Sequence, residues 1–184
     1  EIASCLVGSE MCIRDRLPEE EIQSLIDRIV SRGGMVKNLH GQKNLYYQVN
    51  ATYYSALGEA DEKMLLARAI QMFMPGKPQV WYLDLFAGKN DHEAVRRAGE
   101  SGHKEINRTN LSTDQIAEDL KKDVVQKQLA LIRMRNTHKA FSEGAEVAIS
   151  GGESSLQIRW EYNSAFATLN VNFESGTYTI VESR

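Results

Sequence analysis

The sequence has 184 residues, a formal net charge of -3 at pH 7, 42% hydrophobic residues and 26% charged residues. This length suits one domain of ordinary size, and the apolar content is sufficient for a core. The weak negative charge argues against a surface for nucleic acid or for anionic membranes. No apolar run approaches the roughly 18–20 residues of a membrane span.

The beginning of the chain does not resemble the rest of it. Both cysteines, Cys5 and Cys12, lie in the stretch CLVGSEMCIRDR, which is too short and too polar for the apolar region of a signal peptide. This stretch matches one reading frame of a common transposase-type sequencing adapter. We therefore assign residues 1–16 to the adapter and expect the natural sequence to begin near Leu17, with its preceding part missing. The cysteines then say nothing about the redox compartment.

Two helices are predicted next, with a long loop between them. Pro18 and the glutamates after it are typical of a helix start, because acidic side chains interact well with the positive end of the helix dipole. Apolar residues recur at helical spacing until Gly33 and Gly34 end this helix. The polar and aromatic segment from Met35 to Gly58 is predicted to be a loop, and a second, buried helix is expected from Asp61 to Met74.

The middle of the chain predicts a strand, a loop and more helix. The run PQVWYLDLF, from Pro78 to Phe86, is almost continuously apolar, as in a strand that is covered on both faces. A loop rich in glycine, asparagine and charge follows from Ala87 to Leu111. Ser112 and Gln115 form a capping box, in which Gln115 is expected to reach back to the cap, and a helical stretch in one or two pieces then runs to about His138.

The end of the chain has a different pattern. After Gly144, apolar and polar residues alternate with a period of two, as in 156–162 and 167–173. This alternation predicts an antiparallel β module with one face in solvent. One buried strand between two helices is not a complete parallel sheet, so we expect the chain to be the end of something larger.

Four stretches together resemble one family, the sucrose phosphorylase group of the α-amylase superfamily. The resemblance covers nearly all of the chain from Leu17 onward, in order and with plausible spacing. The PGKPQVWY piece is typical of the whole superfamily, whereas the YQVNATYY and AGKND…INR pieces are more specific. The stretches are YYQVNATYYSALG (Tyr46–Gly58), ARAIQMFMPGKPQVWYLDLFAGKND (Ala67–Asp91), KEINRTNLS (Lys104–Ser112) and VVQKQLALIRMRNTHKAF (Val124–Phe141).

The resemblance implies an α/β fold, the C-terminal fragment of a (β/α)8 barrel followed by a small antiparallel β domain. Residues 17–58 would be a subdomain inserted after the seventh barrel strand, 59–142 the C-terminal part of the barrel, and 143–184 the β domain. Within the barrel part, Val80–Leu85 would be the eighth strand. Barrel enzymes have their active sites in the loops after the strands, and the loop after Val80–Leu85 would be one of these.

The chemistry that the resemblance implies is a retaining transfer of glucosyl from sucrose or a related α-glucoside to phosphate, which gives α-glucose 1-phosphate. The catalytic carboxylates of the family belong to stretches before Leu17, so no catalytic residue is assigned here. No cofactor is expected, and the histidines lack metal-ligand spacing. The expected partners are a small sugar and inorganic phosphate, without nucleic acid or membrane; a homodimer is compatible with the resemblance, and a cytoplasmic location is expected.

Substrate-binding residues are carried over at four positions. Tyr47 and Gln48 match the family loop that lines the acceptor and phosphate subsite. Lys104 stands where the family has an arginine that helps to hold the donor glucose, and Arg108 is expected to share that role. Two departures matter: Leu45 replaces the aspartate of sucrose-specific members, which puts fructose recognition in doubt, and lysine lacks the two-pronged hydrogen bonding of arginine.

Other interpretations stay open at this point. The acceptor could be glycerol, glycerate or a phosphorylated fructose, as in a glucosylglycerol or glucosylglycerate phosphorylase. The enzyme could be a hydrolase or transglucosylase of the same superfamily. A carbohydrate-binding β module without catalytic activity is a third class. Lys104 and Arg108 could also be ordinary surface residues in salt bridges.

Overall fold

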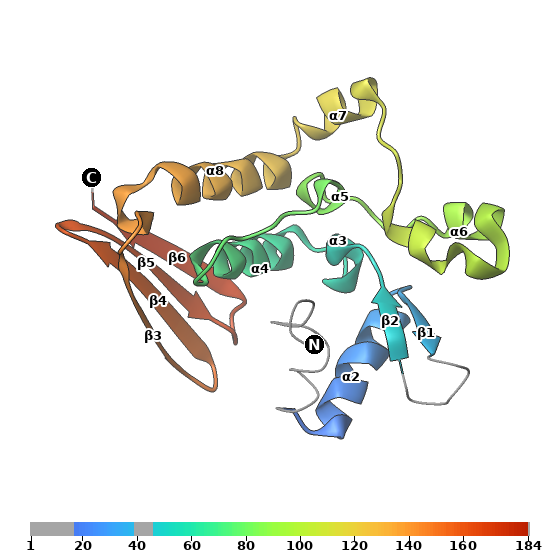
Figure 1. Ribbon diagram of the computed structural model, residues 1–184, viewed down its shortest axis with the longest axis horizontal. Helices are drawn as coiled ribbons and strands as arrows, with labels where there is room; N and C mark the ends of the chain where they lie inside the picture. The colour runs from blue at the N-terminus through green and yellow to red at the C-terminus, as the bar shows by residue number, and fades with distance from the viewer. Residues whose placement is uncertain (1–16, 39–45, 184) are drawn as a thin grey trace, which may run out of the picture.

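The computed structural model describes residues 17–38 and 46–183 of the chain, so the predicted adapter segment and Leu45 lie outside the described residues. The described elements form three groups along an elongated molecule, as Figure 1 shows. A four-stranded sheet lies at one end, a pair of helices extends from it, and a hairpin with short helices lies at the other end. Within the described residues, no helix is long and apolar enough to cross a membrane.

The first group consists of a helix and a two-stranded antiparallel sheet. Three glutamates occupy the first turn of the helix, as the sequence predicts. In the sheet, Val36 pairs with Val49 and Lys37 pairs with Gln48. The elements are α2 (Glu19–Ser31), β1 (Met35–Asn38), β2 (Tyr46–Asn50) and the single-turn helix α3 (Tyr53–Ala56).

This hairpin corrects the prediction that Met35–Gly58 is a loop. The two strands are short and are separated in the sequence. The pattern of residues within either strand therefore does not reveal that it pairs with the other. Thr52 then caps α3, because its side-chain oxygen accepts the N–H of Ser55 at 3.1 Å.

The second group is built on two long helices that pack against each other, α4 and α8. The buried Arg68 of α4 joins them, since its Nε donates to Gln128 Oε1 at 2.8 Å. Gln128 in turn donates to the Leu85 carbonyl at 3.0 Å, which fastens the end of α5 to α8. The elements are α4 (Asp61–Phe73), α5 (Tyr82–Leu85), α7 (Thr113–Asp119), α8 (Asp123–Thr137) and the short 3-10 helix η3 (Lys139–Phe141).

The prediction of a buried strand at Val80–Leu85 is wrong for this chain. The backbone of Trp81 is extended, but it joins no sheet, and Tyr82–Leu85 forms one helical turn. A barrel strand is hydrogen-bonded to a neighbour on each side, and the described residues supply neither neighbour. Trp81 and Tyr82, which belong to the run predicted as a strand covered on both faces, are 50% and 37% exposed.

One of the two hydrogen bonds expected of the capping box is confirmed. Ser112 Oγ accepts the N–H of Gln115 at 3.1 Å. The Gln115 side chain, however, donates forward to Asp119 Oδ1 at 2.9 Å instead of reaching back. The sequence left open whether the helical stretch that follows forms one piece or two. The structure shows two, α7 and α8.

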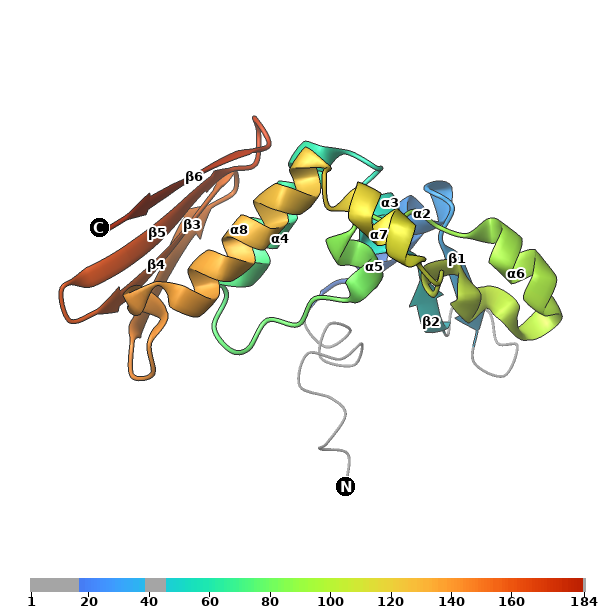
Figure 2. The same cartoon turned by 90° about the horizontal axis from the view of Figure 1, so that it is seen from above.

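The third group is the predicted β module, and it is confirmed. Its four strands form an antiparallel meander in the order β3-β4-β5-β6. One face packs on α4, α8 and η3, and Figure 2 shows the two long helices beside the sheet from above. Ile158, Ala167 and Leu169 on this face are fully buried. Phe173, expected on the buried face, is instead 47% exposed at the end of the sheet. The strands are β3 (Glu146–Gly152), β4 (Ser155–Tyr162), β5 (Ala165–Asn172) and β6 (Thr177–Glu182).

The loop predicted at Ala87–Leu111 contains helical structure. It forms α6 (His92–Ala98) and the 3-10 helix η2 (Gly99–Asn107), which pack on each other. η2 also contacts both strands of the hairpin. Two segments that are far apart in the sequence, and that carry the predicted site residues, are thus brought together.

Candidate functional site

The candidate site lies where the hairpin β1–β2 meets the 3-10 helix η2. Gln48 is on β2, and Lys104 is in the last turn of η2. These elements are joined by a hydrogen bond from Asn107 Nδ2 to the carbonyl of Ala51, at 3.3 Å, just beyond the end of β2. The structure therefore brings two of the four predicted residues, Gln48 and Lys104, into one region.

The other two predicted residues are placed differently. Tyr47 also lies on β2, but its side chain is outside the described part of the structure. Arg108 follows η2 and is exposed, with Nη1 3.9 Å from Glu105 Oε1. It lines a surface hollow beside α6 together with Asp91 and Arg97, and not the region of Gln48. The alternative interpretation, in which Arg108 is an ordinary surface residue in a salt bridge, agrees with this position.

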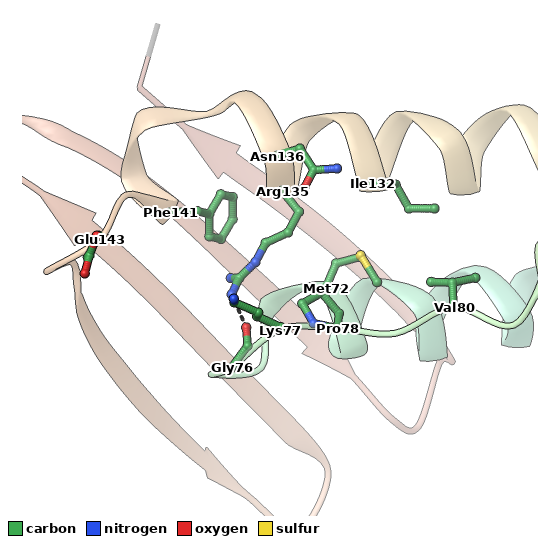
Figure 3. Close-up of a pocket in the computed structure, with 10 residues that line it drawn as sticks. All are labelled: Met72, Gly76, Lys77, Pro78, Val80, Ile132, Arg135, Asn136, Phe141 and Glu143. Carbon is green, nitrogen blue, oxygen red and sulfur yellow. Dashed lines mark hydrogen bonds between the residues drawn. The ribbon is translucent and has the colours of Figure 1, made fainter.

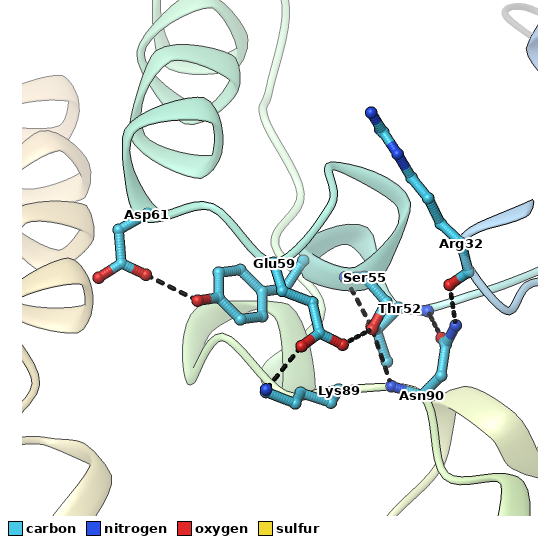
Figure 4. A network of polar contacts seen from close by, with 8 residues as sticks. Arg32, Thr52, Ser55, Glu59, Asp61, Lys89 and Asn90 are labelled. Carbon is cyan, nitrogen blue, oxygen red and sulfur yellow. Dashed lines mark hydrogen bonds and ion pairs between the residues drawn. The ribbon is translucent and has the colours of Figure 1, made fainter. Parts of the chain in front are cut away.

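A network of polar contacts fixes the position of this region, and Asn90 is at its centre (Figure 4). Asn90 Oδ1 accepts the N–H of Thr52 at 2.7 Å, and the N–H of Asn90 donates to Ser55 Oγ at 3.0 Å. Its Nδ2 also donates to the carbonyl of Arg32 at 3.5 Å. One side chain thus connects the end of α2, the exit of β2 and the loop that leads to η2.

Charged groups extend this network. Glu59 Oε1 accepts from Ser55 Oγ at 3.0 Å, and Glu59 Oε2 lies 2.6 Å from Lys89 Nζ. The hydrogen bond from Lys89 is the largest cause that holds the pKa of Glu59 below its usual range. Lys89 and Asn90 are adjacent, so the loop after α5 is fastened to the segment after β2 at two points.

Asp91 stabilises the structure of this loop through hydrogen bonds. Its Oδ1 accepts the N–H of Ala94 at 2.8 Å and caps α6, and its Oδ2 accepts from Thr109 Oγ1 at 3.1 Å. These hydrogen bonds, with the one to Ala94 first, hold the pKa of Asp91 below its usual range. Its N–H also donates to the carbonyl of Ile106 at 2.9 Å, which closes the turn that contains Lys104.

The structure adds a histidine that sequence analysis did not select. His103 is only 8% exposed, and its Nε2 is buried without a hydrogen-bond partner among the described residues. Burial lowers the pKa of His103, and the charges of Lys37 and Lys104 lower it further. Its position next to Lys104 in sequence was a usable signal, but its burial depends on pairing that only the fold reveals.

The side-chain amides of two residues on β2 also have buried atoms that lack a hydrogen-bond partner among the described residues. Gln48 Oε1 and Asn50 Nδ2 are buried and have no partner in the described part of the chain. Buried polar atoms are normally hydrogen-bonded, so three such atoms on two elements in contact are unusual. Asn50 could have been found by reading YYQVN as a strand, since every second residue then faces the same side.

The described residues contain no group of three or more histidine, cysteine or acidic side chains that could hold a metal ion. The site as described consists of amides, a neutral imidazole and lysines. Such groups can bind hydroxyls and oxyanions. They do not form the carboxylate pair of a retaining glycosidase.

Known proteins show strong similarity to this chain, although no family model matches it. A sucrose 6(F)-phosphate phosphorylase of Ilumatobacter coccineus is 52% identical over 167 residues, which are 89% of this chain and 32% of that protein. A sucrose phosphorylase of Bifidobacterium adolescentis is 36% identical and covers 92% of this chain and 34% of that protein. A glucosylglycerol phosphorylase of Marinobacter adhaerens is 37% identical, covering 94% and 38%.

A solved structure agrees with these sequences. The crystal structure of sucrose 6F-phosphate phosphorylase from Thermoanaerobacter thermosaccharolyticum matches with a TM-score of 0.87 and 35% identity. The match covers 94% of this chain and 34% of that one, in its C-terminal part. The chain is homologous to the C-terminal part of the sucrose phosphorylases. It spans about a third of the length of the relatives it matches, and the α/β fold with a terminal β domain is confirmed.

Proposed function

We propose that this chain is the C-terminal part of a retaining glucoside phosphorylase and forms one wall of its substrate site. The observation that carries the proposal is the junction of β2 and η2, where Gln48 Oε1, buried and without a hydrogen-bond partner among the described residues, lies in the same region as Lys104. Its support is the similarity to relatives whose names all describe phosphorylases of glucosides.

The proposed reaction is a glucosyl transfer in two steps. The bond between the anomeric carbon and the glycosidic oxygen breaks, a carboxylate takes the glucosyl group, and a carboxylic acid gives its proton to the leaving sugar. Phosphate then attacks the anomeric carbon, frees the carboxylate and returns a proton to the acid. The products are α-glucose 1-phosphate and the free sugar. We propose that both carboxyl groups lie before Leu17 in the complete enzyme.

Each predicted residue has a role in this proposal. Gln48 offers a donor and an acceptor to a hydroxyl or phosphate oxygen. Tyr47 is proposed to line the same acceptor subsite, and Lys104 to contact the donor sugar with its ammonium group. Arg108 is proposed only to support Lys104 through the turn, since its side chain lines another hollow.

The proposal is tested with a chimera that joins residues 17–184 to the N-terminal part of the Ilumatobacter relative. The assay measures release of α-glucose 1-phosphate from sucrose, sucrose 6F-phosphate and glucosylglycerol, with and without phosphate. Phosphate-dependent release is expected from at least one of these donors. Release of glucose that does not require phosphate would instead support a hydrolase, the alternative within the same superfamily.

A matched pair of variants then tests the wall of the site. Gln48→Ala is expected to reduce kcat/KM for the preferred donor by about tenfold or more, because a hydrogen bond to the substrate is lost. Gln126→Ala, on the exposed side of α8, is the control. A Gln48→Ala chimera with unchanged kinetics would contradict the role proposed for β2. A homodimer and a cytoplasmic location stay predictions, which light scattering and cell fractionation of the complete enzyme would test.

A further inference from the structure

Two adjacent aromatic side chains hold the C-terminal end of η2. Trp81 is the residue before the single-turn helix α5, and Tyr82 is the first residue of that helix. The indole Nε1 of Trp81 donates to the carbonyl of Asn107 at 3.1 Å. The hydroxyl of Tyr82 donates to the carbonyl of Thr109 at 2.8 Å. Both donors therefore act on the backbone of one short segment, at positions two residues apart.

These two aromatic residues are not core residues in the described part of the chain. Trp81 is 50% exposed and Tyr82 is 37% exposed, and their rings are tilted against each other with centroids 4.9 Å apart. Their polar groups nevertheless reach carbonyls 26 and 27 residues further along the chain. What the described contacts of these side chains fix is therefore the backbone of the segment that follows η2.

The same segment is held from its other side by its own side chains. Asn107 Nδ2 donates to the carbonyl of Ala51 at 3.3 Å, just after β2. Thr109 Oγ1 donates to Asp91 Oδ2 at 3.1 Å, at the start of α6. Asn107 and Thr109 are thus each held by two hydrogen bonds, one to the carbonyl oxygen and one from the side chain.

Lys104 belongs to the turn that these hydrogen bonds hold. It lies in the last turn of the 3-10 helix η2, three residues before Asn107. Because a 3-10 helix has three residues per turn, Asn107 lies one turn beyond Lys104. The lysine ammonium is at the end of a flexible four-carbon stem, so a fixed backbone is needed to place it against a substrate group.

We propose that Trp81 and Tyr82 are positioning residues for Lys104, because they fix the turn from which its ammonium group contacts the donor sugar. This inference rests on the proposed function and goes beyond it, since it assigns a role to two residues that act through the backbone. Loosening the turn weakens binding of the sugar, whereas the bond-breaking step, which the proposal assigns to carboxyl groups elsewhere in the enzyme, is left intact.

The first experiment removes one donor at a time in the chimera. Tyr82→Phe deletes only the hydroxyl and keeps the ring. It is expected to raise the KM for the preferred donor about fivefold, the effect of one neutral hydrogen bond, with kcat changed less than about twofold. Trp81→Phe removes the indole donor and should act in the same direction. Tyr162→Phe, on β4 in the β domain, is the matched control.

The second experiment repeats Tyr82→Phe in a Lys104→Met chimera. If Tyr82 acts through Lys104, its effect on KM should disappear in this background, because no ammonium group remains to be positioned. An effect of equal size in both backgrounds would show a merely structural role and overturn the inference. A KM that Tyr82→Phe leaves unchanged in the original chimera would also overturn it.

A binding measurement separates this inference from the proposed function. If the chimera has no phosphorylase activity, calorimetry with sucrose, sucrose 6F-phosphate and glucosylglycerol in phosphate-free buffer still tests the inference. Binding that Tyr82→Phe weakens about fivefold, but only when Lys104 is present, would support it even if the proposed reaction is wrong. Equal affinities of the chimera and its Tyr82→Phe variant would reject it. Binding of none of these sugars would reject both proposals.

Discussion

At the scale of single residues, Tyr54 shows how the segment after β2 is held to α4. Its hydroxyl donates to Asp61 Oδ1 at 2.8 Å, at the first residue of α4. Burial raises the pKa of Tyr54 to about 12, and the hydrogen bond and charge of Asp61 contribute to the increase. Tyr54 is thus a neutral donor to a carboxylate at the start of the helix.

The raised pKa of Tyr54 predicts a pH dependence of stability. The unfolded chain has a tyrosine pKa of about 10, so above that pH the unfolded state loses its proton before the folded state does. The contribution of Tyr54 is complete below pH 10 and is lost as the pH rises toward about 12. In the chimera, Tyr54→Phe should therefore reduce the fall in urea midpoint between pH 9 and pH 11. The same fall in both proteins would contradict the assignment.

Asn90 provides a second prediction at this scale. Asn90→Ala removes the acceptor for the N–H of Thr52, a residue that is 1% exposed. An unsatisfied buried donor costs about 1–3 kcal/mol of stability. Because Asn90 also fixes the exit of β2, the donor KM of the chimera should rise as well. Asn90→Asp keeps the acceptor oxygen and should retain more of both properties. Equal effects of the two substitutions on the urea midpoint and on KM would contradict this role.

At the scale of elements, the sheet is fastened to the helices by aromatic and cationic side chains. Trp160 of β4 donates from Nε1 to the carbonyl of Phe73 at 2.6 Å, at the end of α4. Arg135 of α8 lies over the rings of Trp160 and Phe141, with Cζ 4.3 Å and 4.6 Å from their centroids. Its Nη2 also donates to the carbonyl of Gly76 at 2.9 Å, in the loop after α4.

Arg135 borders a pocket between these elements, which Figure 3 shows. The pocket lies among the end of α4, the loop after it, α8 and η3, and its walls are mainly apolar. Arg135 Nη1 is buried without a partner among the described residues, and burial lowers the pKa of the Arg135 guanidinium. The position of Arg135 indicates a clamp between the barrel part and the β domain.

The clamp predicts a difference between two substitutions on α8. Arg135→Lys keeps a positive charge but removes the planar group that stacks on two rings and donates to Gly76. In the chimera it should lower the free energy of unfolding by about 1–3 kcal/mol, measured by urea denaturation. Arg133→Lys, at an exposed position on the same helix, should change it little. A similar midpoint for the two variants would show that Arg135 does not fasten the domains.

The sequence predicted best those elements whose stability is local or repeated. The helix Glu19–Ser31 and the four-stranded meander follow from apolar spacing of 3.6 and 2 residues. The hairpin β1–β2 was missed because its strands are short and their pairing is not visible in either strand alone. The strand at Val80–Leu85 was wrong because a run that is apolar on both faces forms a strand only when neighbours supply hydrogen bonds.

The same distinction applies to the candidate site. Gln48 and Lys104 were identified from a family resemblance, and the structure places their elements in contact. Asn50 and His103 were not selected, because the burial of their polar atoms depends on strand pairing and on the contact of η2 with the hairpin. Arg108 matched a motif, but its side chain lines a separate hollow. A motif identifies positions along the chain, whereas the fold decides which side chains meet.

At the scale of the whole molecule, several large apolar side chains of the described residues are exposed to solvent instead of packed in a core. Trp81 is 50% exposed, Leu25 53% and Val181 52%. The elements extend away from the sheet as separate groups, as Figures 1 and 2 show, and do not surround one common core. The match to the solved relative covers 34% of that protein's chain, and we expect the exposed apolar side chains to be covered only in a longer protein.

This arrangement predicts how residues 17–184 behave in isolation. The chain around Trp81 is extended but unpaired, and open backbone edges with exposed apolar side chains favour aggregation. We expect the isolated segment to be inactive, to unfold without a cooperative heat-capacity peak and to give a poorly dispersed amide spectrum. In the chimera, the same residues should unfold cooperatively, because exposed apolar side chains such as Trp81 are then expected to be covered. A sharp melt and a dispersed spectrum for the isolated segment would show that its helices and sheet are sufficient for a stable fold.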